Sequence, residues 1–155
     1  MKTFDHLTVI GLREWIGLPE LGIGQIKAKI DSGAKTSALH ATDIETFTRE
    51  GQTWVRFDAH TGSLKRPGRK PCEAPLVSIR QVRSSNGQSQ SRYTIRTPMV
   101  LGDKCWLVDF TLTCRKAMRY RVLLGCTAML DGQLVINPGL RFVQDKPQPP
   151  PYTQG

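Results

Sequence analysis

The stretch that decides the fold runs from residue 28 to residue 40 and reads Ala28-Lys29-Ile30-Asp31-Ser32-Gly33-Ala34-Lys35-Thr36-Ser37-Ala38-Leu39-His40. Ile26, Ala28 and Ile30 alternate with polar residues, which is the period of a strand with one buried face. Asp31 follows at the end of this strand, and the small residues after it allow backbone amides to approach its carboxylate. We therefore expect a strand that delivers one carboxylate into a glycine turn. Asp-Ser-Gly is also common in ordinary turns, so the tripeptide alone does not establish a reactive site.

The composition is that of one β-rich domain. With 155 residues, the chain is long enough to bury about two thirds of the surface of its unfolded form, and it has no room for a second domain. The 39% hydrophobic and 7% aromatic residues, with 14 glycines and 10 prolines, indicate a modest core and many turns. We place the domain at residues 1–143 and expect the proline-rich segment 144–155 to be a disordered tail.

Apolar or alternating segments predict strands along most of the chain, at residues 7–11, 25–30, 44–48, 54–60, 76–83, 91–96, 99–101, 105–113, 120–125 and 134–137. Asn86-Gly87 predicts a tight hairpin turn between two of them. Only 126–130 is expected to be helical. The segment 61–71 carries four basic residues among glycine and proline, which predicts an exposed loop. This loop either contacts an acidic partner or is simply solvated.

Charge and motifs restrict the class of protein. The 22 Lys and Arg against 13 Asp and Glu give a net charge of +9, which attracts acidic partners without identifying them. The four cysteines form no Cys-x-x-Cys pair and none lies at ligand spacing from a histidine, so we expect no metal site. We expect no cofactor, because the sequence has no glycine-rich phosphate loop for ATP. No signal peptide or membrane span is evident, which predicts a cytoplasmic protein with reduced thiols.

Two distant signals combine into a family resemblance. Ile30-Asp31-Ser32-Gly33-Ala34 ends one strand, and Val122-Leu123-Leu124-Gly125 ends another. This pairing resembles the retropepsin-like aspartic proteases, which implies a mainly β fold, a single closed β-barrel lobe with one short helix near the C-terminus. The closer similarity is to a family named for ATP-dependent zinc proteases and linked to a glutamate ligase that modifies a small-subunit ribosomal protein. It covers residues 9–11, 13–15, 18–22, 26–41, 82–87, 95–97 and 123–125.

The sequence departs from this family at three positions. Ser32 stands where the family more often has threonine, and either hydroxyl can hydrogen-bond across a dimer axis. Cys126 stands in place of an arginine, so any ion pair that this arginine makes at an interface is absent. Gln90 stands where an acidic residue is expected two positions before Arg92.

Aspartic-protease chemistry needs two carboxylates that share a proton and a water. The sequence contains one Asp-Ser-Gly, so the second carboxylate must come from a twofold partner. We therefore expect a homodimer with an Asp31 pair on its axis, titrating as one coupled unit.

The resemblance also implies roles for single residues. Asp31, Ser32 and Gly33 form the catalytic turn, and the segment 84–87 is a flap over the cleft. His40 is equally compatible with a hydrogen-bonded structural role, and Lys35 with simple solvation. The residues expected to support the turn from behind are Leu123, Leu124 and Gly125, and those expected along the substrate path are Lys35, Thr36, His40, Ser85, Asn86 and Arg92.

The resemblance thus implies an aspartic-type peptidase that hydrolyses peptide bonds in acidic, glutamate-rich protein tails, such as that of a glutamate-tailed ribosomal protein, and the net charge of +9 agrees with such a substrate. A membrane or a directly bound nucleic acid is not expected as a partner. The alternative is a noncatalytic basic β-barrel module that binds an acidic partner such as RNA or a ribosomal surface, although loop 61–71 lacks the aromatic residues that suit RNA. A zinc hydrolase is a third alternative, which the lack of His-Glu-x-x-His and of clustered ligands disfavours.

Overall fold

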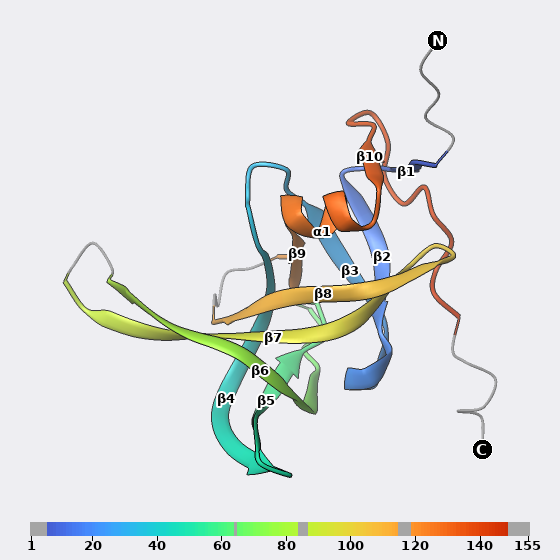
Figure 1. The fold of residues 1–155 in the computed structure, drawn as a ribbon. Coiled ribbons are helices and arrows are strands. Elements are labelled where there is room, and N and C mark those ends of the chain that lie inside the picture. The colour runs from blue at the N-terminus through green and yellow to red at the C-terminus, as the bar shows by residue number, and fades with distance from the viewer. Residues whose placement is uncertain (1–5, 64, 84–86, 115–118, 149–155) are drawn as a thin grey trace.

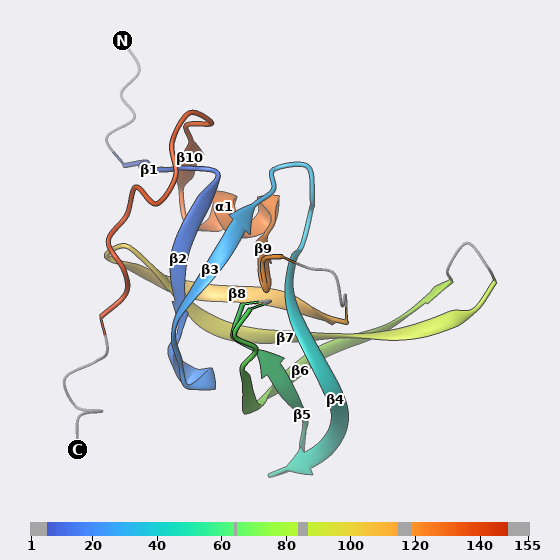
Figure 2. The same cartoon turned by 180° about the vertical axis from the view of Figure 1, so that it is seen from behind.

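Figures 1 and 2 show a computed structural model of the chain, which describes residues 6–63, 65–83, 87–114 and 119–148. The elements in chain order are β1 (Thr8–Ile10), β2 (Arg13–Leu18), the 3-10 helix η1 (Pro19–Leu21), β3 (Ile23–Ile30), β4 (Ser37–Arg49), β5 (Gln52–His60), β6 (Arg69–Arg83), β7 (Ser89–Leu101), β8 (Lys104–Thr113), β9 (Val122–Leu124), α1 (Cys126–Asp131) and β10 (Leu134–Ile136). The predicted class is confirmed, since the protein is mainly β with one short helix near the C-terminus.

The strands form one large sheet that folds back on itself and one small sheet. The large sheet has the order β2-β3-β9-β4-β5-β6-β7-β8, and the additional pairings β2–β7 and β4–β8 connect strands that lie far apart in this order. The small sheet pairs β1 with β10 in parallel. Figure 1 shows α1 beside β9 and β10, at the end of the fold where β3 leads into β4.

The core follows from alternation within the strands. In β3, Ile26, Ala28 and Ile30 are at most 5% exposed while the residues between them face outward, as their spacing predicts. Phe57 of β5 and Phe110 of β8 are the largest fully buried side chains. Burying an apolar side chain of this size contributes about 1.5–3 kcal/mol, so these positions dominate the packing energy.

Two predicted boundaries differ from the structure. The segments 35–41 and 44–48 belong largely to one strand, β4, which continues through an irregularity at Asp43, where φ is +55°. Aspartate tolerates this left-handed conformation better than most residues, so the strand bends instead of ending. Strand β6 begins at Arg69, so the basic loop is confined to residues 61–68.

The chain remains packed beyond the predicted boundary at residue 143. Glu14 of β2 is completely buried, and its carboxylate accepts hydrogen bonds from the backbone N–H groups of Gly11 (2.8 Å), Val143 (2.9 Å) and Gln144 (3.0 Å). Pro147 is also buried, and its carbonyl oxygen accepts a bond from the Gln25 side chain at 3.1 Å. Residues 144–148 are therefore held against β2 and β3, and residues 149–155 lie outside the described part of the chain.

Candidate active site

The Asp31 turn is held at the end of β3 by backbone and side-chain hydrogen bonds. The Asp31 N–H donates to the carbonyl oxygen of Leu124 at 2.9 Å, which fixes the residue against β9. Its carboxylate oxygen Oδ1 accepts the N–H of Gly33 at 3.0 Å, and its carbonyl accepts the N–H of Ala34 at 3.2 Å. An aspartate that bonds the backbone two residues ahead forms an Asx turn. The turn therefore fixes the orientation of the carboxylate before any ligand binds.

Glycine at position 33 leaves room for the carboxylate. A Cβ placed on Gly33 would lie 3.3 Å from Oδ1 of Asp31, a tight contact. Asp31 itself is half-buried, whereas Ser32, Gly33, Lys35 and Thr36 are exposed. Among the ion pairs of the described residues, none involves Asp31. The carboxylate thus sits at the surface with an open side.

Strand β9 and the start of α1 lie against this turn, and Leu123, Leu124 and Gly125 belong to this region. Strand β9 lies between β3 and β4, with Leu124 beside Ile30 and Leu123 beside both Lys29 and Ala38. The backbone N–H groups of Cys126 and Thr127 donate to the carbonyls of Ala34 (2.7 Å) and Lys35 (3.1 Å). The loop after Asp31 is therefore attached to the beginning of α1.

Gly125 allows this close attachment. Its N–H donates to the buried hydroxyl of Ser37 at 2.9 Å, and a Cβ at this position would lie only 2.5 Å from the carbonyl oxygen of Thr36. Any side chain here would push the loop away from α1. Ser37 is a supporting residue that the sequence analysis did not single out, because a serine in a small-residue run carries no signal of its distant partner.

His40 lies away from the turn. The His40 N–H donates to the carbonyl oxygen of Arg121 at 2.9 Å, so His40 lies beside the residue that precedes β9. Arg121 precedes Leu124 by three residues, or about 10 Å of strand. His40 is 3% exposed, its Nδ1 contacts the carbonyl oxygen of Thr113 at 3.2 Å, and its ring lies 4.3 Å from that of His60. This is the hydrogen-bonded structural position that the sequence left open.

The β6–β7 hairpin projects from the body of the fold. Both views show it extending sideways beyond the other strands (Figures 1 and 2). Arg92 lies on this hairpin, exposed and directly opposite Arg80. Ser85 and Asn86 lie outside the described residues, so the flap stays a prediction.

The described residues show neither a cluster of metal ligands nor a membrane-spanning helix. These residues contain no group of three or more His, Cys, Asp and Glu side chains that could hold a metal ion. None of the helices in this part of the chain is long and apolar enough to cross a membrane.

Comparison with known proteins identifies the family. The mainly β fold is that of a retropepsin-like family. Residues 9–147 match the RimB-like family, described as retropepsin-like aspartic endopeptidase RimB. The chain therefore belongs to the RimB-like family.

Two relatives and one crystal structure resemble the chain over most of its length. A protein of Desulfotalea psychrophila is 46% identical over 133 residues, and one of Shewanella pealeana is 45% identical over 131. Both are named "Probable alpha-L-glutamate ligase". The matches cover 86% and 84% of this chain but only 28% and 29% of those relatives, so the chain spans less than a third of their length. A crystal structure of a Legionella pneumophila protein of unknown function matches with a TM-score of 0.75 and 28% identity, covering 89% of this chain and 98% of that one.

Proposed function

We propose that the chain is an aspartic-type peptidase that acts as a homodimer, with Asp31 of each subunit forming the catalytic pair. The observation that carries the proposal is the Asp31 carboxylate, oriented by the Gly33 amide at 3.0 Å and fixed from behind by Leu124. Membership of a retropepsin-like family supports the same chemistry. Each chain contributes one such turn, so a complete site needs a second copy.

The proposed reaction uses the pair as base and acid. Two carboxylates within hydrogen-bond reach of each other cannot both ionise, so they share one proton. The ionised member removes a proton from a water molecule, whose oxygen attacks the peptide carbonyl carbon, while the protonated member donates to the carbonyl oxygen. The tetrahedral intermediate then expels the amine, which takes up a proton, so one water is consumed and a carboxyl and an amine are released. Ser32 would link the two turns, and Gly33 would allow the substrate backbone to approach.

The proposed substrate is a protein with an acidic, glutamate-rich tail. The net charge of +9 favours such a partner, and Lys35 and Thr36 are exposed in the same loop as Asp31, where they can contact it. The two relatives are named as glutamate ligases, proteins whose name implies joining glutamate, and a peptidase that removes glutamate-rich ends would oppose that reaction. This pairing of activities is part of the proposal.

The proposal is tested by incubating the purified chain with a peptide that ends in several glutamates and by measuring product masses. We expect the wild type to shorten the peptide, the variant Asp31→Asn to leave it intact, and Asp103→Asn to match the wild type. Asp103 is a suitable control because it is an exposed aspartate of the turn between β7 and β8. Cleavage retained in Asp31→Asn contradicts the mechanism, whereas an intact peptide in every sample contradicts the substrate.

One observation favours the alternative, a noncatalytic module that binds an acidic partner. Arg80 and Arg92 face each other across β6 and β7 on the extended hairpin. Like charges directly opposite in a sheet are destabilising, and a bound anion would relieve the repulsion between these two. Tight binding of an acidic peptide with no cleavage by the wild type would favour this reading.

A further inference from the structure

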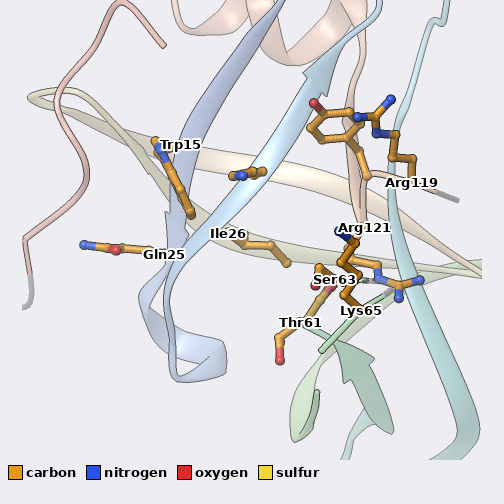
Figure 3. Close-up of a pocket in the computed structure, with 11 residues that line it drawn as sticks. Trp15, Gln25, Ile26, Thr61, Ser63, Lys65, Arg119 and Arg121 are labelled. Carbon is orange, nitrogen blue, oxygen red and sulfur yellow. Dashed lines mark hydrogen bonds between the residues drawn. The ribbon is translucent and has the colours of Figure 1, made fainter. Parts of the chain in front are cut away.

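A cleft lies beside β3, next to the residues that precede β9 in the chain (Figure 3). Its volume is about 500 Å³, within the range of small-ligand sites. Three parts of the chain line it: the middle of the β2–β3 hairpin, residues 61–63 and 65 of the basic loop, and residues 119–121 before β9. Neither the position of residues 119–121 nor that of Trp15 beside the basic loop was evident from the sequence.

The cleft is strongly cationic. Lys27, Lys65, Arg119 and Arg121 line it, and no carboxylate of the described residues does. Lys27, Lys65 and Arg119 are exposed, whereas Arg121 is 8% exposed. Four positive charges around one concave surface repel each other, and bound anions relieve this repulsion. The ligand that fits is therefore one that carries several negative charges.

Hydrogen bonds to the backbone hold Arg121 and the loop that carries Lys65 in place. Nε of Arg121 donates to the carbonyl oxygen of Gly62 at 3.0 Å, which ties loop 61–68 to the segment before β9. A Cβ on Gly62 would collide with the carbonyl oxygen of Arg66, so the loop can close tightly only with glycine. The loop is also closed by the Thr61 N–H, which donates to the carbonyl of Gly68 at 2.9 Å. Lys65 is thus presented by a compact loop.

The aromatic rings of the cleft are already occupied by cations. The Nζ atoms of Lys27 and Lys146 lie 5.3 and 4.7 Å from the Trp15 ring centroid, and the guanidinium of Arg13 lies 5.1 Å from that of Tyr120. Proteins that bind single-stranded nucleic acid use exposed ring faces for stacking bases. Here the rings instead hold cations in place, which favours carboxylates over bases as ligands.

The cleft lies in line with the Asp31 turn. Lys27 and Lys29 point outward on alternate positions of β3, and Asp31 is the next residue in this alternation. Four residues of extended chain span about 13 Å. Strand β9, which starts after the cationic residues 119–121, runs parallel to β3 toward the same turn. An extended peptide along this surface would place groups about four residues apart at the cleft and at Asp31.

We propose that this cleft binds carboxylate side chains of an acidic peptide, about four residues away from the bond that lies at Asp31. Carboxylate binding in the cleft is inferred from the lining residues and their charges, independently of the proposed peptidase activity. Its role in selecting the cleaved bond rests on the proposed function.

Binding is measured in the Asp31→Asn full-length chain, which separates it from cleavage. The probe is a fluorescein-labelled hexaglutamate at low salt, with the dissociation constant taken from fluorescence anisotropy. We expect Lys65→Gln and Arg119→Gln each to raise this constant about threefold to fivefold, and the double variant about tenfold or more. Arg56→Gln removes the same charge from an exposed position of β5 that does not line the cleft, and is expected to change the constant less than twofold. Circular dichroism verifies that each variant is folded.

The outcomes are distinguishable. Equal dissociation constants in the cleft variants and the Arg56→Gln control overturn the cleft as the binding site. Tighter binding of an oligouridine of equal charge, weakened by the same variants, overturns the carboxylate ligand. If the variants weaken hexaglutamate binding but the wild type cuts no acidic peptide, the proposed function fails and the binding site stands. If the wild type does cut, a raised KM with unchanged kcat in Lys65→Gln supports the selecting role, and an unchanged KM overturns it.

Discussion

Removing the buried carboxylate of Glu14 is the change with the most sharply defined consequence for stability. Glu14 is 0% exposed and accepts three backbone hydrogen bonds of 2.8–3.0 Å. In Glu14→Ala, the N–H groups of Gly11, Val143 and Gln144 lose a charged acceptor. A hydrogen bond to a charged group contributes about 1.5–3 kcal/mol, partly offset because a carboxylate no longer has to be buried. We expect the free energy of unfolding to fall by about 3–5 kcal/mol.

The variant Glu14→Gln gives an intermediate case. The amide oxygen can occupy the position of Oε2, which bonds Gly11 and Val143, but its NH₂ then faces the N–H of Gln144. One bond of three is lost, so we expect a decrease of about 1–3 kcal/mol.

Urea unfolding gives the free energies, and amide hydrogen exchange shows whether Val143 and Gln144 lose protection. Glu20→Ala is the control, since Glu20 is an exposed acid of η1. A Glu14→Ala protein within about 0.5 kcal/mol of the wild type, with both amides still protected, would refute the reasoning.

Three further predictions follow from other parts of the fold. Gly125→Ala places a Cβ 2.5 Å from a carbonyl oxygen of the loop before β4 and should lower stability by about 1–3 kcal/mol in thermal unfolding. Burial, followed by nearby positive charges, lowers the pKa of His40 and of His60, so the unfolded chain binds protons that the folded one does not. The contribution of the two histidines to stability should therefore be constant above about pH 7 and fall as the pH drops through 6.5 toward the lowered pKa values, by up to about 1.4 kcal/mol per pH unit for each histidine, in urea titrations. Burial raises the pKa of the Cys72 thiol to about 11, so iodoacetamide at pH 8 should label the exposed Cys105 and Cys114 before Cys72, as read by peptide mass spectrometry.

The sequence predicted those features whose signals are local. The alternation around Ile26 and Ile30 located β3, and the position of Asp31 after it located the turn. The run Leu123-Leu124-Gly125 was expected behind that turn, and β9 lies there. Each of these predictions uses residues within one strand length, where side-chain periodicity is set by backbone geometry.

The features that were missed depend on distant partners. Glu14 reads as a surface residue, because nothing near it shows that N–H groups 129 and 130 positions later bind its carboxylate. The cationic cleft joins Arg121 to a carbonyl 59 residues earlier. Strand β6 was predicted too short because Pro71 and Pro75 suggested a loop, although both pair with β5. Proline is tolerated in a strand where its missing N–H is not needed for the ladder.

The central claim is that two Asp31 carboxylates from two chains form one site, and subunit mixing tests it most directly. Equal amounts of wild type and Asp31→Asn are unfolded together in urea and refolded, so that subunits exchange at random. Cleavage of the glutamate-tailed peptide is then compared with that of the same total amount of refolded wild type. If both carboxylates are needed, only wild-type homodimers are active and the mixture retains about one quarter of the activity. A mixture that retains about one half would contradict the account, because each Asp31 would then act alone.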